Sequence, residues 1–186
     1  MTRRTPIAVL SALMLAAAPA VALAAQVSAP VALATATGPG AAAGAIAFAD
    51  GANGATITVD LHGLPPGQHG FHLHQNGDCG PAAPAAGATT GAAPAPVPAG
   101  AAGGHLDPDH TGMHMGPTAK GHLGDLPFLT VAADGTDHET LTAPRLTDVA
   151  ALKGHAVVIH AGGDNYADQP KPLGGGGARI ACGVIE

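Results

Sequence analysis

Six of the eleven histidines and one aspartate stand in short segments whose residue types and spacing suit metal binding. His72 and His74 are two positions apart, so on a strand both side chains project from one face and reach the same ion. His160 ends another apolar stretch and approaches from a neighbouring strand. Three imidazoles suit Cu(II) or an open zinc site. A single histidine is more often a surface or core residue, so this pattern alone leaves the question open.

A second set of candidate ligands lies in a Gly- and Pro-rich stretch. It provides three ring nitrogens and one carboxylate, the number that closed tetrahedral zinc takes. Its members are His105, His114, His122 and Asp125. The stretch has no strand or helix pattern, so an ion would supply the free energy that orders it. A solvated polar loop is the alternative.

The segments around these residues predict short β-strands separated by turns. Asp50-Gly51 and Asn53-Gly54 are typical turn sequences, and Pro65-Pro66-Gly67 is another. The expected strands are 27–35, 44–49, 56–61, 69–74, 126–132, 138–142, 156–160 and 178–185, with one helical turn at 146–152. Long irregular loops are expected at 76–125 and 162–177. Short strands without a long amphipathic helix favour an all-β sandwich or barrel.

Residues 81–100 are almost wholly Ala, Pro, Gly and Thr. Alone, such a tract is typical of a disordered linker between two domains. Candidate ligands and both cysteines lie on its two sides, so we expect one domain that carries a flexible insertion. The following stretch, 103–125, is expected to be ordered by metal.

The first 24 residues have the features of a signal peptide. Arg3 and Arg4 precede an apolar run at 7–18, and Ala22-Leu23-Ala24 is a small-residue cleavage site. A retained membrane anchor is the alternative, but the run is short for a spanning helix. We expect a domain of residues 25–186, exported to the periplasm or secreted, with no membrane attachment after cleavage.

Composition narrows the function further. The formal net charge is −6 and there is no basic patch, which argues against nucleic acid as a partner. Trp is absent, so the core must be built from Val, Ile, Leu and Ala. Export makes a disulfide between Cys79 and Cys182 plausible, and two buried free thiols are the alternative.

Six strings distributed over the predicted domain resemble the copper/zinc superoxide dismutases, most of all the exported bacterial type. They are Gly-Phe-His72-Leu-His74, Gly-Gly-His105-Leu-Asp-Pro, His114-Met-Gly-Pro, Gly-His122-Leu-Gly-Asp125-Leu-Pro, Val-Ile-His160-Ala-Gly-Gly-Asp164-Asn-Tyr and Gly-Gly-Ala-Arg179-Ile-Ala-Cys182-Gly-Val-Ile. The resemblance implies a flattened eight-stranded Greek-key barrel or sandwich with two long functional loops. It also implies dismutation of superoxide to oxygen and hydrogen peroxide, and a possible homodimer.

The resemblance also implies a role for each residue in these strings. Copper would be bound by His72, His74, His105 and His160, and zinc by His105, His114, His122 and Asp125. His105 would be the shared ligand and would deliver a proton during catalysis. Asp164 would accept hydrogen bonds from a ligand of each metal, and Arg179 would guide the anionic substrate. Cys79 and Cys182 would form the disulfide.

Some alternatives and some residues remain beside this interpretation. A non-enzymatic copper- or zinc-binding module and a copper-only relative are the competing functions. Met113 and Met115 flank His114, where soft thioethers favour Cu(I) or simply pack in the loop. Arg179 could instead form a structural salt bridge, and Lys120 and Lys171 are weak candidates for steering the anion. The remaining histidines are expected to be structural or at the surface: His62, His69, His110, His138 and His155.

Overall fold

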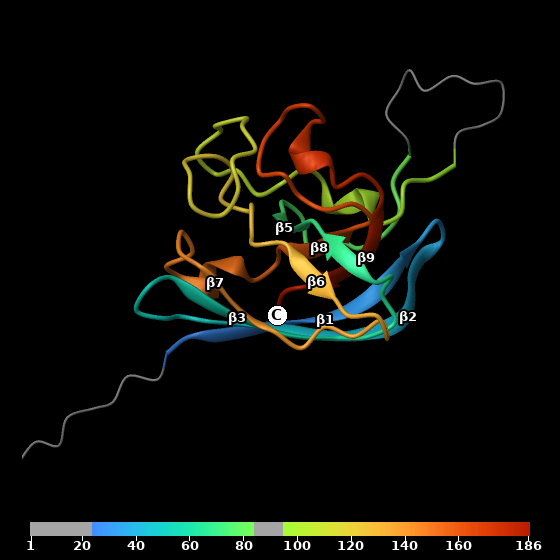
Figure 1. Ribbon diagram of the computed structural model, residues 1–186, viewed down its shortest axis with the longest axis horizontal. Helices are drawn as coiled ribbons and strands as arrows, with labels where there is room; N and C mark the ends of the chain where they lie inside the picture. Colours follow the sequence, from blue (N-terminus) through green and yellow to red (C-terminus); the bar gives the residue numbers. More distant parts are fainter. Residues whose placement is uncertain (1–23, 84–94) are drawn as a thin grey trace, which may run out of the picture.

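The computed structural model describes residues 24–83 and 95–186, so nearly all of the predicted signal peptide lies outside the described residues. The described part contains strands and three short 3-10 helices (Figure 1). The strands are β1 (Gln26–Thr35), β2 (Gly38–Ala49), β3 (Ala55–Leu61), β4 (Gly67–His69), β5 (Phe71–His74), β6 (Leu129–Val131), β7 (Thr140–Ala143), β8 (Ala156–His160) and β9 (Arg179–Val184). The 3-10 helices are η1 (Gly100–Ala102), η2 (Val149–Leu152) and η3 (Leu173–Gly175). The predicted all-β class is confirmed.

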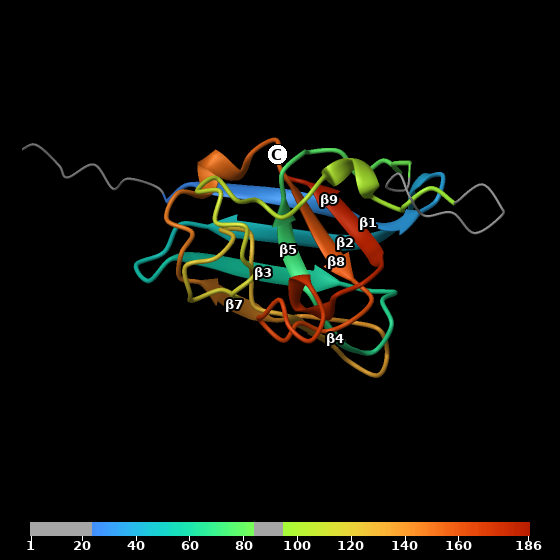
Figure 2. The ribbon, with the colours of Figure 1, turned by 90° about the horizontal axis from the view of Figure 1, so that it is seen from above.

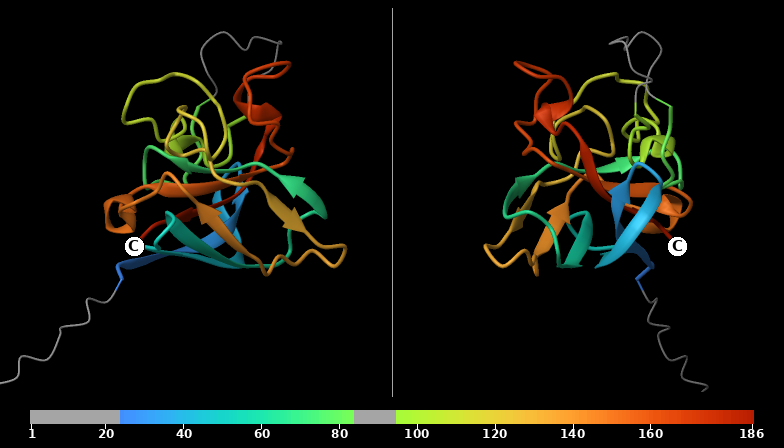
Figure 3. Two further views of the ribbon diagram at one scale, coloured as in Figure 1. Left: turned by 60° about the vertical axis from the view of Figure 1, so that its left-hand side comes forward. Right: turned by 90° about the vertical axis from the view of Figure 1, so that its right-hand side faces the viewer.

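Seven strands form one antiparallel sheet in the order β5-β8-β9-β1-β2-β3-β7, and β4 pairs with β6 in a second, two-stranded sheet. The large sheet curls, so that β5, β8 and β9 lie over β1, β2 and β3 (Figures 1 and 2). Both long loops extend from the β5–β8 layer on the same side of the molecule (Figure 3). This arrangement brings segments far apart in the sequence onto one face.

The core lies between the two layers and follows the alternation of the strands. In β3 every second residue, beginning with Ala55, is buried, while Asp60 faces outward. Phe48 and Phe71 are the largest fully buried side chains, and most of the rest are Val, Ile, Leu and Ala, as the composition predicts. Across the described residues, no helix is long and apolar enough to cross a bilayer.

The expected single strand 69–74 is wrong, because the chain forms two strands that belong to different sheets. His69 ends β4 opposite Leu129 of β6, whereas Phe71 begins β5 opposite Ile159 of β8. Gly70 lies between them, and its N–H donates to the carbonyl oxygen of Gly162 at 2.7 Å. This bond to a distant loop is a tertiary interaction that the strand pattern of the sequence does not contain.

The Ala/Pro-rich tract is less uniform than expected. Residues 84–94 lie outside the described residues, but Ala82 and Val97 on either side pair with each other through two backbone hydrogen bonds. Ala99 is completely buried. Ala99, near the end of the tract, packs beside Ala156 and Val158, while the flexibility of 81–100 stays a prediction.

Asp137 provides a test of stability outside the loops. Its side chain is buried, and Oδ2 has no hydrogen-bond partner. Burial, then the charge of Glu139, raises the pKa of Asp137 to about 6. An unfolded Asp titrates near 3.9, so this group's contribution to stability is complete below about pH 4 and is lost as pH rises through about 6.

We expect Asp137→Asn to raise the free energy of unfolding at pH 7 by about 1–2 kcal/mol, and to change it little at pH 4. Chemical denaturation of the metal-free wild type and variant at both pH values measures the difference. A difference that does not depend on pH would contradict the explanation.

Candidate metal centre

The first two histidines project from β5 away from the core. The side chains of Phe71 and Leu73 enter the main core cluster, and by strand alternation His72 and His74 point to the opposite face. His72 pairs with Val158 and His74 with Ala156 across to β8. Both histidines are completely buried, because the two long loops cover this face.

A register shift between β8 and β9 places two further residues beside them. The regular pairing of these strands breaks between Ile159 and His160, and His160 then lies opposite Arg179. Such irregularities redirect side chains and are frequent next to active sites. The shift explains how a ligand-type residue and a cation from neighbouring strands reach one pocket.

The loop residues are held by backbone pairing with the free edge of β5. Leu73 donates to Gly124 and accepts from Leu106, which brings Asp125 opposite His72 and His105 opposite His74. Gly124 is required here, since a Cβ at that position would lie 2.3 Å from the Leu73 carbonyl oxygen. One histidine and one carboxylate of the loops, His105 and Asp125, are thus positioned by main-chain bonds.

Four histidines form a first cluster, in which one nitrogen of each ring lies within 4.8 Å of the others. Each of these rings has a buried nitrogen without a hydrogen-bond partner: His72 Nδ1, His74 Nε2, His105 Nε2 and His160 Nε2. Buried polar atoms are normally paired, so four that lie together without partners fit a missing cation. The cluster has the donor set of a copper site.

The other ring nitrogens of the first cluster are engaged by fixed acceptors. His72 Nε2 lies 2.8 Å from Asp164 Oδ2, His74 Nδ1 lies 3.0 Å from the Gly103 carbonyl oxygen, and His160 Nδ1 lies 3.2 Å from that of Gly177. When the nitrogen beside the acceptor carries the ring's N–H, the other nitrogen of the same ring has a free lone pair that faces the cluster. The ring orientations and tautomers therefore suit metal binding.

Burial keeps the first cluster neutral. Burial, together with the charges of nearby imidazoles, lowers the pKa of His105 to about 4 and that of His160 to about 3. Burial likewise lowers the pKa of His72, and lowers that of His74 well below its ordinary value. Neutral imidazole is the form that binds metals, so His72, His74 and His160 have no proton to lose near neutral pH.

The second cluster consists of His105, His114, His122 and Asp125, and all four are buried. Asp125 Oδ1 lies 3.0 Å from His105 Nδ1, 2.9 Å from His114 Nδ1 and 3.3 Å from His122 Nδ1. Ligands 2.0–2.1 Å from a tetrahedral zinc are about 3.3 Å apart. The spacing of this cluster fits a four-coordinate zinc ion.

Protonation equilibria in the second cluster also fit a cation. Burial opposes ionisation of Asp125, but hydrogen bonds from His105 and His114 hold its pKa well below the ordinary value. Burial lowers the pKa of His114, but the carboxylates of Asp125 and Asp164 outweigh it and raise the pKa to about 9. The two carboxylates that favour a proton on His114 would also favour a dication in the second cluster.

Asp164 joins the two clusters. Besides His72, its carboxylate contacts Nε2 of His114 at 2.8 Å and accepts a bond from the Tyr166 N–H at 2.7 Å. Gly174 lies directly against it at a φ of 70°, and a Cβ there would lie 2.0 Å from Asp164 Oδ1. Geometry thus brings Asp164 into contact with a histidine from each cluster.

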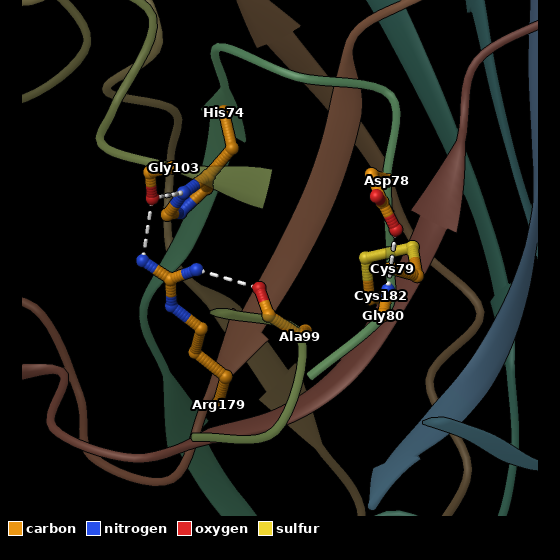
Figure 4. Close-up of a disulfide and its surroundings, with 8 residues drawn as sticks. All are labelled: His74, Asp78, Cys79, Gly80, Ala99, Gly103, Arg179 and Cys182. Carbon is orange, nitrogen blue, oxygen red and sulfur yellow. Dashed lines mark hydrogen bonds between the residues drawn. A yellow bond between two sulfur atoms is a disulfide. The ribbon is translucent and has the colours of Figure 1, made fainter. Parts of the chain in front are cut away.

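Arg179 lies at the mouth of the first cluster and is fixed by two carbonyl oxygens (Figure 4). Its guanidinium donates to Ala99 and Gly103, both at 2.6 Å, and Gly103 also bonds His74. The adjacent pocket has a volume of about 220 Å³ and is lined by His74, Gly104, His105, His160, Pro172, Leu173, Gly177 and Arg179. No ion pair of Arg179 is found among the described residues, so the alternative of a structural salt bridge has no support.

The disulfide closes the same region. Cys79 and Cys182 are bonded, with their Cα atoms 5.7 Å apart, which agrees with the predicted pairing (Figure 4). The bond ties the beginning of the Ala/Pro-rich tract to β9, the strand that carries Arg179. Ala99 at the end of that tract packs against Cys182 in a small second core.

The remaining histidines lie outside the two clusters. His69 is buried and both ring nitrogens lie 2.7 Å from carbonyl oxygens, those of His160 and Pro65, so it braces the backbone beside the first cluster. His62, His110 and His138 are exposed, and His138 pairs with Asp60 at 3.0 Å. His155 contacts the Gln75 carbonyl oxygen.

The two methionines beside His114 point to solvent. Met113 is 46% exposed and Met115 is 41% exposed, whereas His114 between them is buried. About half of each side chain is therefore covered by the loop. The nitrogens of the buried first cluster all come from histidine.

Other contacts of the site involve residues that the sequence motifs do not single out. Asp168 accepts a bond from the His114 N–H at 2.9 Å and another from the Leu173 N–H at 3.2 Å. It thereby joins the loop of the second cluster to the rim of the pocket. The carbonyl groups of Ala99 and Gly103 had no signal in the sequence, because every residue has a carbonyl group.

Comparison with known proteins agrees with this geometry. The family model described as copper/zinc superoxide dismutase (SODC) matches residues 42–185. Superoxide dismutase [Cu-Zn] 2 of Salmonella typhimurium is 56% identical over 133 residues, which are 72% of each chain. The structure of Cu/Zn superoxide dismutase from Brucella abortus matches with a TM-score of 0.79 and 46% identity, over 87% of this chain and 100% of that one.

A solution structure of the monomeric copper, zinc superoxide dismutase from Salmonella enterica matches with a TM-score of 0.74 and 49% identity, again over 87% of this chain and 100% of that one. The family model matches the chain from within β2 to β9, and this range includes the strands and loops that supply both clusters. Copper and zinc are the metals of these relatives, and the two donor sets fit them. The chain belongs to the copper/zinc superoxide dismutase family.

Proposed function

We propose that the first cluster holds copper, that the second holds zinc, and that His105 is bound to both. The main support is that Nε2 of His105 belongs to the first cluster while its Nδ1 faces Asp125 in the second. A shared imidazole has to lose both N–H protons, and two nearby dications favour that anion. The assignments of His72, His74, His160, His114, His122 and Asp125 follow from membership of the clusters.

The overall reaction converts two superoxide anions and two protons to oxygen and hydrogen peroxide. Copper held by His72, His74, His105 and His160 would supply the one-electron redox chemistry that this reaction needs. His105 would contribute a proton site whenever Nε2 is not bound to copper, because Nε2 lies at the pocket while Nδ1 stays in the second cluster. A proton held at Nε2 is within reach of the peroxide that forms in the pocket.

Arg179 supplies a permanent positive charge at that pocket. The protein is acidic, with a formal net charge of −6, so an anionic substrate is attracted only where a local cation outweighs the background. The two carbonyl oxygens of Ala99 and Gly103 hold the guanidinium in place without neutralising it. Asp164 orients His72 and His114, and zinc orders the loop rather than reacting.

The test is superoxide consumption by the mature protein after loading with copper and zinc. We expect a second-order rate constant close to the diffusional limit that falls as ionic strength rises. Arg179→Gln should lower the constant about 10-fold and weaken its dependence on ionic strength. Lys153→Gln removes the same charge at an exposed position beyond η2 and serves as the control.

Two outcomes would contradict the proposal. Tight binding of both metals without superoxide consumption would favour a non-enzymatic metal-binding module. Uptake of copper without zinc would favour a copper-only protein, although the complete second cluster argues against it. In that case the position of His105 between the two clusters would need another explanation.

Export to the periplasm or secretion belongs to the same proposal. It is supported by the disulfide, which persists in oxidising compartments, and by the bacterial origin of the similar dismutases. The homodimer expected from the resemblance stays a prediction. The Salmonella enterica relative is described as monomeric.

A further inference from the structure

One zinc-cluster histidine differs from the other histidines in how its ring is held. Four rings have their second nitrogen fixed by an acceptor: His72 and His114 by Asp164, His74 by Gly103 and His160 by Gly177. His105 faces a cluster with each nitrogen. Within the described residues, no hydrogen bond orients the ring of His122, although its Nδ1 lies 3.3 Å from Asp125 Oδ1.

The position of His122 therefore depends on its backbone, and Arg145 holds that backbone. Nη1 of Arg145 donates to the His122 carbonyl oxygen at 2.8 Å, and Nη2 donates to that of Gly121 at 2.9 Å. On the other side, the His122 N–H donates to the Met113 carbonyl oxygen at 2.9 Å. The main chain at His122 is thus fixed from both directions in a loop without regular structure.

Arg145 itself is attached to a rigid part of the fold. The next residue, Leu146, is buried in the core, and so are Val149 and Leu152 of η2. Asp148 caps η2 by accepting from two backbone N–H groups. A planar guanidinium that offers two parallel donors matches two adjacent carbonyl oxygens, whereas the ammonium group of lysine does not.

We infer that Arg145 is a positioning residue for zinc, which sets the direction of His122 by fixing the carbonyl groups of residues 121 and 122. The inference rests on the proposed assignment of the second cluster to zinc. Arg145 touches neither the first cluster nor the pocket, so its effect should be confined to the zinc site. Partners beyond the ligands commonly change metal affinity about 10–100-fold.

The test compares Arg145→Gln and Arg145→Lys with the wild type in the full mature protein, with Lys153→Gln as the charge-matched control. Zinc affinity is measured by competition with a chelator, and Co(II) in place of zinc reports ligand geometry through its visible absorption. We expect zinc affinity to fall about 10–100-fold in Arg145→Gln, and less in Arg145→Lys, with altered Co(II) bands. Copper affinity and the control should match the wild type.

Unchanged zinc affinity and Co(II) bands in both variants would overturn the inference. Equal losses of zinc and copper affinity, together with a lower melting temperature of the metal-free protein, would also overturn it, because they would indicate a general structural role. If the wild type itself binds no zinc, the assignment of the second cluster fails, and the inference fails with it. If the wild type binds zinc and the Arg145 variants bind it equally well, only the inference about Arg145 fails, and the assignment of the second cluster to zinc stands.

Discussion

His105→Ala should release both metals, with copper and zinc affinity each falling more than about 100-fold, and with superoxide consumption falling in parallel. Each cluster of four loses one donor, and even partners outside the coordination shell change affinity about 10–100-fold. Nε2 of His105 faces the first cluster and Nδ1 faces the second, so alanine removes a donor from each. Metal content after dialysis and competition with chelators measures both affinities.

Two variants separate the shared ligand from an ordinary one. His122→Ala removes a member of the second cluster alone, so zinc should be lost while copper stays bound. His138→Ala removes an exposed histidine that pairs with Asp60 and serves as the matched control. Selective loss of one metal in His105→Ala would contradict the shared ligand.

The candidate ligands could be located in the sequence because their chemistry is carried by residue type. An imidazole two positions from another reaches the same face of a strand, which is how His72 and His74 lie in β5. Turn sequences and alternating apolar residues likewise predict most strands. The composition predicts a core built from Val, Ile, Leu and Ala, and these residues make up most of the buried core.

The contacts that hold these ligands in position were not predictable in the same way. Ala99 and Gly103 act through carbonyl groups, which every residue has. The register shift at His160 depends on how β8 and β9 pair, and such pairing is a property of two strands rather than of one pattern. The break at Gly70 depends on a bond to the distant loop at Gly162.

The Ala/Pro-rich tract illustrates how tertiary contacts override local composition. Alanine and proline alone indicate flexibility, but Ala99 enters a small core with Cys182 and Val158. The contact became possible because the disulfide and β9 bring distant residues to that place. Arg179 donates a hydrogen bond to the Ala99 carbonyl oxygen, so part of a tract that looked like an insertion helps to shape the pocket beside Arg179.

The role of Asp164 depends both on its residue type and on its place in the tertiary structure. Its replacement is expected to have the second large effect on metal affinity. His72 and His114 each present Nε2 to its carboxylate and Nδ1 to a cluster. A carboxylate accepts from both N–H groups at once. Asparagine has the same shape, but one of its two terminal atoms is a donor.

We expect Asp164→Asn to weaken one metal about 10–100-fold and to change the other much less. The side-chain NH₂ of asparagine faces one ring, and that ring has to place its proton on Nδ1 to accept the bond. The proton then occupies the atom that binds metal, so that site loses affinity. The other ring keeps the tautomer it has with Asp164.

Chelator competition for copper and zinc in Asp164→Asn shows which ring loses its tautomer. Asp164→Ala is the companion variant, since it removes the acceptor from both rings and should weaken both metals. Asp109→Asn is the matched control, because it makes the same replacement at an exposed position in the loop of the second cluster. Equal and large losses of both metals in Asp164→Asn would mean that charge rather than tautomer control is the main contribution of Asp164.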